Sequence, residues 1–301
     1  MSSAGTIQAG GGRTTPVDRV SYERQMRPRF ALVAALGGVL LFAGAVIQSI
    51  GPQAKVSELT VQLLVTDRRV GLEILGSVVN ALGILALAAT LWFLFTAVKA
   101  RKPEVSPATW ITAVVGGALA AAGGIGYALV ITSKAHQFAT QGLQTYPEAN
   151  HLLRSGPVAV LQYGGLVGSL LLAVAFVLIA LNAMRVGLLT KFLGYLGMAA
   201  AAASLLLIGS SPALLIEVFW LLGTAYLLSG RWPNGDPPAW RSGEAVPWPS
   251  SAQVREERLK AREARGRGGQ PAKRNEPRPQ PVTASTGARS PAAKRKRKRR
   301  K

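Results

Sequence analysis

Long uncharged apolar runs alternate with short polar segments between residues 30 and 229 of this chain. The runs 157–181 and 192–209 contain no charged residue, and a short turn carrying Arg185 and Lys191 separates them. About twenty apolar residues, each rising 1.5 Å along a helix, match the roughly 30 Å hydrocarbon core of a bilayer. The pattern therefore predicts a helical hairpin that crosses a membrane twice.

Four further apolar runs predict four more membrane-spanning helices. We therefore expect an all-α membrane protein, a six-transmembrane-helix bundle covering residues 30–230. The six spans are expected at about 30–50, 72–98, 110–132, 157–181, 192–209 and 212–229. Small residues at four-residue spacing allow close helix packing or, alternatively, a dimer face; they include Gly116, Ala120, Gly124 and Ala128 in the third span and Gly164 and Gly168 in the fourth.

The polar ends of the chain are expected to lie outside this bundle. Residues 1–29 are rich in Gly, Ser and Thr, which predicts a disordered N-terminus. Residues 231–301 are polar and basic, and they are interpreted as a long disordered C-terminal tail with one short helix at 251–265. Both ends are expected in the cytoplasm.

The positive charges of the loops support this topology. Of the 35 Lys and Arg residues, 20 lie in the tail; the remaining cations divide ten to five in favour of the side that carries both termini. Because cytoplasmic loops carry an excess of Lys and Arg, the count predicts a multi-pass protein of the inner or plasma membrane with both termini inside.

The tail ends in eight consecutive cations: Lys294, Arg295, Lys296, Arg297, Lys298, Arg299, Arg300 and Lys301. Anionic phospholipid headgroups are the nearest partners, since each cation contributes about 1 kcal/mol close to an anionic membrane surface. RNA or the ribosome is an alternative partner, because phosphate binding requires only charge. A solvated run that merely fixes the topology is the third interpretation.

Glu217 is the sharpest candidate for a functional residue. It lies about five positions inside the sixth span, roughly 8 Å below the outer edge, where an ionisable group is costly and marks a site. Arg69 or Arg154 is its expected partner. The candidate polar site comprises Glu217, Glu73, Arg69, Gln162 and Tyr127. The alternative is a structural ion pair or a hydrogen-bonded carboxylate, and Arg69 with Glu73, four residues apart, fits a purely local pair.

Uncharged polar residues and histidines complete the candidates. Asn80, Gln48 and Gln162 lie within spans, where interhelical hydrogen bonds explain them more often than ligand contacts. Two loop histidines, His136 and His151, without cysteine or nearby carboxylates, favour solvated side chains over a metal site. Nucleophile, zinc-protease and phosphate-loop motifs are missing from the sequence, so we predict neither an enzyme nor a cofactor.

The middle of the chain resembles a bacterial family of six-span membrane proteins of unknown function. The resemblance covers roughly residues 30–230 and is carried by three segments: Arg68–Leu72, Met184–Leu189 and Phe192–Gly197. It implies a fold and a membrane location, but no activity. The sequence therefore predicts first a non-enzymatic accessory or structural membrane protein whose tail binds anionic lipid or a cytoplasmic partner. The alternative is a small-molecule or ion transporter that uses Glu217.

Overall fold

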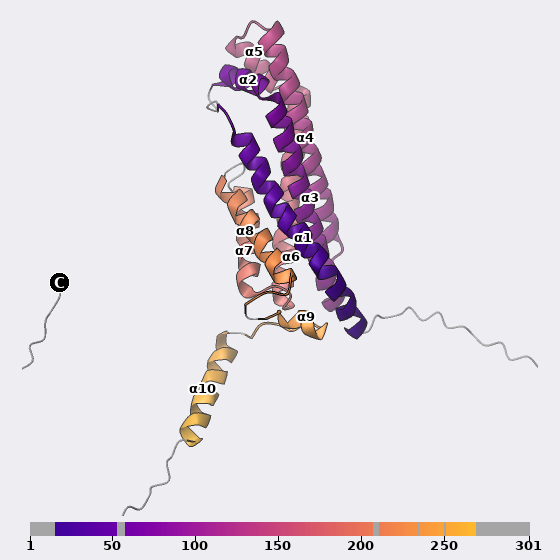
Figure 1. Ribbon diagram of the computed structural model, residues 1–301, viewed down its shortest axis with the longest axis vertical. Coiled ribbons are helices and arrows are strands. Elements are labelled where there is room, and N and C mark those ends of the chain that lie inside the picture. The colour runs from indigo at the N-terminus through magenta and orange to yellow at the C-terminus, as the bar shows by residue number, and fades with distance from the viewer. Residues whose placement is uncertain (1–15, 53–57, 207–210, 234, 250, 269–301) are drawn as a thin grey trace, which may run out of the picture. The chain divides into compact units, whose positions relative to one another are not determined.

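The computed structural model describes residues 16–52, 58–206, 211–233, 235–249 and 251–268, and all regular structure among them is helical (Figure 1). The chain divides into two compact units, residues 1–248 and 249–301. In the second unit, α10 (Ser251–Gly268) covers the helix predicted at 251–265 and carries a 2.7 Å ion pair between Lys260 and Glu256. The eight cations at 294–301 lie outside the described residues.

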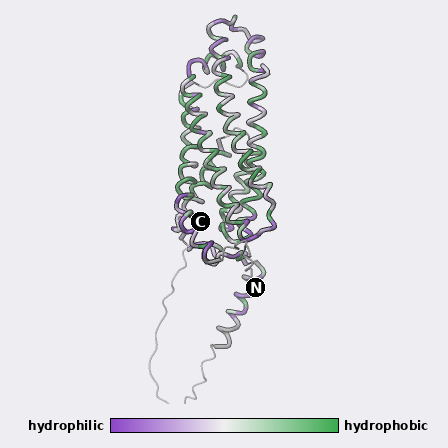
Figure 2. The backbone as a smooth tube through the Cα atoms, turned by 90° about the vertical axis from the view of Figure 1, so that its right-hand side faces the viewer, coloured by the Kyte–Doolittle hydropathy of each residue, from purple (hydrophilic) through white to green (hydrophobic). Residues whose placement is uncertain are grey.

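Four of the described helices are long and apolar enough to cross a membrane. They are α1 (Pro16–Ser49), α3 (Val70–Arg101), α4 (Ala108–Gln141) and α6 (Gly156–Arg185), with 30 to 34 residues each. Figure 2 shows their hydrophobic residues in green between more polar ends. The described part of the chain is thus all-helical and includes four helices that could cross a membrane, as the apolar runs predict.

The last two predicted spans form a shorter helical pair. Helix α7 (Lys191–Leu206) has 16 residues and α8 (Ser211–Leu228) has 18, which corresponds to about 24 and 27 Å. Both are shorter than the other four helices, and in Figure 1 they end well below the tips of α3 and α4. The apolar helices are where the sequence places them, but six full crossings stay a prediction.

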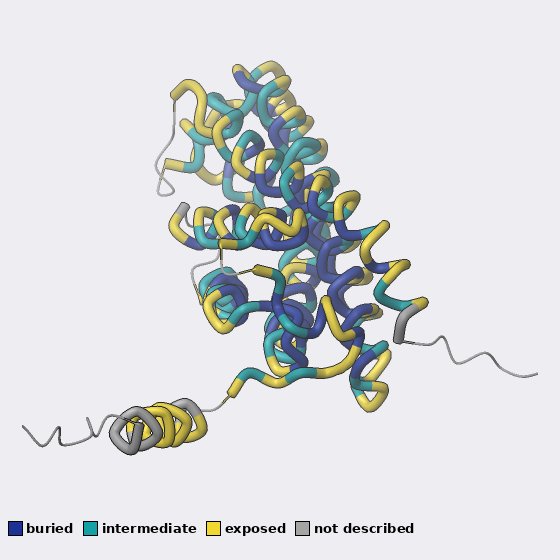
Figure 3. The backbone as a smooth tube through the Cα atoms, turned by 60° about the horizontal axis from the view of Figure 1, so that its bottom comes forward, coloured by how far each residue is buried: buried dark blue, intermediate teal, exposed yellow. Residues whose placement is uncertain are grey.

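The six apolar helices of the first unit form a ring. Each packs against the next in the order α1, α3, α4, α6, α7, α8 and back to α1, while α3 and α6 also meet across the ring. Figure 3 shows the buried residues, in dark blue, on the facing sides of these helices. This arrangement places α7 and α8 between the two long helices α1 and α6.

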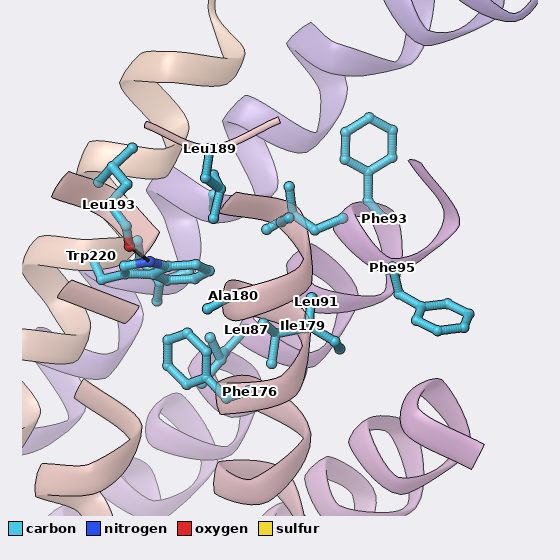
Figure 4. Close-up of a cluster of buried hydrophobic side chains, with 14 of the residues drawn as sticks. Leu87, Leu91, Phe93, Phe95, Phe176, Ile179, Ala180, Leu189, Leu193 and Trp220 are labelled. Atoms are coloured by element: carbon cyan, nitrogen blue, oxygen red, sulfur yellow. Dashed lines mark hydrogen bonds between the residues drawn. The ribbon is translucent and has the colours of Figure 1, made fainter. Parts of the chain in front are cut away.

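One end of the ring is filled by a tightly packed core (Figure 4). The Trp220 ring lies fully buried, edge-on to Phe176 with ring centroids 4.5 Å apart. Its indole N–H donates to the Leu193 carbonyl at 3.0 Å, which ties α8 to the first turn of α7. A buried tryptophan needs such a partner for its N–H, so this bond fixes the position of the short helical pair.

Glycines bring the α4 and α6 backbones into contact. A Cβ atom added to Gly116 would lie 2.5 Å from the Leu172 nitrogen, and one added to Gly123 would lie 2.5 Å from the Gly165 Cα. Gly168 similarly faces the Ala120 backbone. The small residues at 116, 120 and 168 therefore serve intramolecular packing. Gly124 and Gly164 of the predicted rows instead face open space.

The end of the first unit opposite the packed core carries two short helices in segments between the predicted spans, where the sequence predicts loops. Helices α2 (Leu59–Arg68) and α5 (Tyr146–Leu153) pack around the extended end of α4, with Leu63 and Phe138 fully buried between them. Figure 1 shows α2 and α5 at the top, and we refer to this as the α2–α5 end. Only one side of each helix is covered by other parts of the chain, so each helix has few apolar residues. Its sequence therefore does not stand out as helical.

Residues 16–29, predicted to be disordered, instead form the first turns of α1. The reason is a set of partners distant in sequence. Glu23 is 5% exposed and accepts two hydrogen bonds of 2.6 Å from Arg101, and Arg27 donates two bonds of 2.8 Å to Asp236. These paired charges stabilise polar turns that have no apolar face of their own.

Residues 231–248, predicted to belong to the tail, are instead part of the first unit. They include the short helix α9 (Pro238–Ser242), whose Trp240 is 3% exposed. The Trp240 indole N–H donates to the Leu188 carbonyl at 2.8 Å, and that of Trp248 donates to Leu189 at 2.9 Å. We call this the α9 end of the unit. The tail is correspondingly shorter than predicted and follows Trp248.

Candidate functional site

A cavity of about 830 Å³ lies inside the ring of helices, on the side toward the α2–α5 end. All six apolar helices contribute to its wall. Its polar lining side chains are Gln48, Ser49, Asn80, Tyr127, Gln162, Ser169, Ser204 and Glu217. Leucines and alanines, among them Leu41, Leu87 and Leu172, form the rest of the wall where it meets the packed core. The cavity is therefore mostly apolar, with eight polar side chains set in its wall.

The sequence creates this space in two ways. Gly124 lines the cavity and has no neighbour within 4 Å of where a Cβ would lie, so a small residue leaves room there. In addition, the α7–α8 pair is too short to fill the gap between α1 and α6 along its whole length. Ser49 and Gln162 line the cavity and are also exposed, so the cavity is open to the outside of the helix ring near these two residues.

Glu217 lies deep in this cavity. A Cβ on Gly38 of α1 would lie 3.4 Å from the carbonyl oxygen of Val218, which places Glu217 beside the middle of α1. The far end of α1, Ser49, is eleven residues further, or about 17 Å. Helix α8 thus begins well below the end of α1, and the depth of 8 Å below the membrane edge stays a prediction.

The hydrogen-bond partner of Glu217 is also different from the predicted one. Its Oε1 accepts a hydrogen bond of 3.1 Å from the Ser204 hydroxyl on α7. No Lys, Arg or His stands among the residues that line the cavity. The carboxyl group of Glu217 thus has a neutral partner and no nearby cation in the described wall.

Arg69 and Glu73 do not line the cavity. Arg69 donates to the carbonyl oxygens of Pro52 (2.9 Å) and Gln48, and its guanidinium lies 3.5 Å from the Glu73 carboxylate. The expected Arg69–Glu217 pair is therefore wrong, and Arg154, the other expected partner, is exposed on the surface. Arg69 instead fastens the chain after α1 to the start of α3, which is the local role that the spacing of four residues indicates.

The structure thus brings Glu217, Gln162 and Tyr127 to one cavity and adds side chains that sequence reasoning missed. Ser169 donates to the Gly165 carbonyl four residues back at 3.0 Å, and the single hydroxyl proton of Ser204 is shared between Glu217 and the Ala200 carbonyl, also four residues back and at 3.0 Å. Serines in apolar helices commonly satisfy their hydroxyl in this way, so the sequence alone does not mark them as lining residues.

Of the remaining candidates, Gln48 and Asn80 also line the cavity, whereas His136 and His151 do not. His136 approaches Asp67 at 3.0 Å and links α4 to α2 at the exposed α2–α5 end. Gln48 donates to the Ser77 hydroxyl at 3.5 Å, an interhelical contact of the predicted kind, and it also lines the cavity. Within the described part of the chain, no three His, Asp or Glu side chains are placed to hold a metal ion.

Comparison with known proteins adds no relative. No family model, no curated protein and no solved structure matches this chain. The resemblance to a six-span bacterial family consequently stays a prediction. Function is inferred from the geometry of the cavity and from the charge pattern of the chain.

Proposed function

We propose that this protein transports a small cationic molecule or a cation through the cavity around Glu217. One observation carries the proposal: the half-buried carboxyl group of Glu217 lies among apolar helices, in a cavity of about 830 Å³ whose described lining residues include no Lys, Arg or His. An ionised side chain is costly inside a membrane, so a proton or a bound cation must compensate it. Gln162, Asn80 and Tyr127 provide further hydrogen-bonding groups for a guest.

The same proposal includes the finer topology. Six spans place both termini in the cytoplasm, with the α9 end inside and the α2–α5 end outside. The ten-to-five distribution of Lys and Arg outside the tail supports this orientation. The turn between α6 and α7, with Arg185 and Lys191, then faces the cytoplasm together with the end of α3. The tightly packed core closes the cavity toward this side.

The experiment is a flux assay on the full-length protein in lipid vesicles. The probes are Na⁺, K⁺ and a panel of primary and quaternary amines, each supplied outside vesicles that contain a pH-sensitive dye. We expect Glu217→Gln to abolish the uptake that the wild-type protein supports. Glu244→Gln, which neutralises an exposed carboxylate outside the cavity, serves as the matched control. Full uptake by Glu217→Gln would contradict the proposal.

An accessory role at an anionic membrane surface is the second candidate function, favoured by the eight cations at 294–301. Removal of residues 285–301 should weaken binding of the protein's soluble tail peptide, 249–301, to vesicles rich in phosphatidylglycerol but not to phosphatidylcholine vesicles. Binding of the same two peptides to RNA tests the alternative partner. Because the cavity is not involved, Glu217→Gln leaves this binding unchanged in the full-length protein, which separates the two candidates.

A further inference from the structure

A second, smaller cavity of about 290 Å³ lies at the α9 end, between α1 and the segment that carries α9. Three arginines line it, Arg24 and Arg27 from α1 and Arg241 from α9. Two carboxylates, Glu23 and Asp236, and the Trp240 ring form the rest of the polar wall. This cavity is distinct from the one around Glu217, and the proposed transport does not use it.

The base of this arginine cavity is held in place by paired groups. Arg27 forms a two-bond fork with Asp236 at 2.8 Å and donates a further bond of 3.1 Å to the Leu227 carbonyl. Arg101 makes the same kind of fork with Glu23 at 2.6 Å. Both guanidinium groups lie over the Trp240 ring, 5.0 and 5.4 Å from its centroid. Such forks and ring contacts leave the base little freedom to rearrange.

The charges of the cavity do not cancel. Each carboxylate is neutralised by its own forked arginine, whereas the exposed Arg24 and Arg241 have no such fork among the described residues. Both are close to Asp236: after the hydrogen bond from Arg27, the positive charges of Arg241 and Arg24 also contribute to lowering the pKa of the Asp236 carboxyl. Two positive charges therefore remain at the mouth of the cavity.

The cavity also lies at the depth of lipid headgroups. Arg24 and Arg27 precede Phe30, the residue with which the apolar run of α1 begins. Phe30 stacks on Phe93 at 4.3 Å, and Phe93 stacks in turn on Trp240 at 6.0 Å. Headgroups lie where the apolar run of a spanning helix ends, so the start of the run at Phe30 places the cavity at their level.

We propose that the arginine cavity binds a phosphate group, that of an anionic phospholipid in the leaflet facing the α9 end. Planar guanidinium groups match phosphate oxygens in two-bond geometry, which a lysine cluster does not. The guanidinium groups of Arg24 and Arg241, which form no forked ion pair among the described residues, bind the phosphate oxygens. The Arg27–Asp236 ion pair forms the base of the cavity. With the proposed topology, this leaflet is the cytoplasmic one.

The experiment measures binding of short-chain phosphatidylglycerol to the full-length protein in a neutral detergent, by native mass spectrometry. We expect the double variant Arg24→Gln/Arg241→Gln to bind on the order of a hundredfold more weakly than the wild type, because it removes two charge-assisted contacts of roughly 1.5 kcal/mol each. Both side chains are exposed, so the variant retains the fold.

The matched control is Arg29→Gln/Arg231→Gln, which removes two exposed charges of the same region that do not line the cavity. Its affinity should equal that of the wild type. An equal loss in both double variants would overturn the proposal, as would wild-type affinity of Arg24→Gln/Arg241→Gln.

Short-chain phosphatidylcholine and inorganic phosphate are the two further probes. Phosphatidylglycerol binding that exceeds both identifies a lipid site, whereas equal binding of inorganic phosphate overturns the lipid assignment in favour of a soluble phosphate ligand. The basic tail is present in all variants, so its contribution cancels.

Discussion

The α9 end of the first unit and the half toward the α2–α5 end use polar residues in opposite ways. At the α9 end, charged side chains are buried in complete pairs against the Trp240 ring, and Trp220 and Phe176 are buried in the packed core of the same half. In the other half, neutral polar groups line an open cavity that contains one unpaired acid, Glu217. The comparison indicates that one half holds the helices together and leaves the other free to accommodate a guest.

The largest expected effect is on the paired half. Arg101→Ala should lower the free energy of unfolding by about 3–5 kcal/mol, since it leaves the buried Glu23 carboxylate without its fork. Denaturant titration of the purified protein in detergent measures this loss. The double variant Glu23→Gln/Arg101→Met, which removes both charges, should lose clearly less. Equal stability of Arg101→Ala and the wild type would show that the pair does not hold the α9 end.

The next effect concerns the close contact between α4 and α6. Gly168→Ala should cost about 1–3 kcal/mol, because its Cβ would meet the Ala120 backbone and the Leu119 Cβ, the latter at 2.7 Å. Gly164→Ala, one turn away and facing open space, is the control and should cost nothing. The same denaturant titration applies. If the two variants were equally stable, the close approach of the helices would carry no energetic weight.

A smaller effect should follow pH through Asp236. Its pKa lies below the ordinary 3.8, chiefly through the hydrogen bond from Arg27. A lowered folded-state pKa stabilises the protein at pH values above the unfolded one, and this contribution disappears as the pH falls through the folded pKa. The difference in Tm between the wild type and Asp236→Asn should therefore be constant from pH 7 to 5, begin to shrink near pH 3.8, and vanish only once the pH has fallen below the lowered folded-state pKa. A difference that persists at the acid end would assign it to another group.

The smallest effect on stability is expected in the open half. Gly124→Leu fills part of the cavity without a close neighbour, so the free energy of unfolding should change by less than about 1 kcal/mol. Uptake of the cationic probes into vesicles, however, should fall sharply because the guest loses its space. Undiminished uptake at full stability would show that this part of the cavity is not on the transport route.

The sequence predicts the helices better than it predicts their depth and partners. Uncharged runs of sufficient length locate α1, α3, α4 and α6, since the thickness of a bilayer sets a strict length requirement. Glu217 and Gln162 stand out for the same reason, as polar residues in apolar runs. Their position in one cavity depends on how far α8 begins below the end of α1, and no local pattern records that offset.

The α9 end could not be predicted, because its stability comes from contacts distant in sequence. Trp240 stands in a stretch of Pro, Gly and charged residues that has the composition of a linker. Only the folded ring of helices supplies the Leu188 carbonyl for its N–H and the guanidinium groups of Arg27 and Arg101. The first turns of α1 are similar, since Glu23 resembles any solvated acid until Arg101 lies beside it.

The contact between Arg101 and α9 has a consequence for biogenesis. Arg101 donates to the Ala239 carbonyl at 2.9 Å across 138 residues of sequence. A ribosome releases the chain from its N-terminus, so the arginine emerges long before α9 exists. Assembly of this end must therefore wait until the last apolar helix has been inserted. A nascent chain that stops before residue 236 leaves Arg27 without the Asp236 carboxylate and Arg101 without the Ala239 carbonyl, so this end of the unit is completed only late in synthesis.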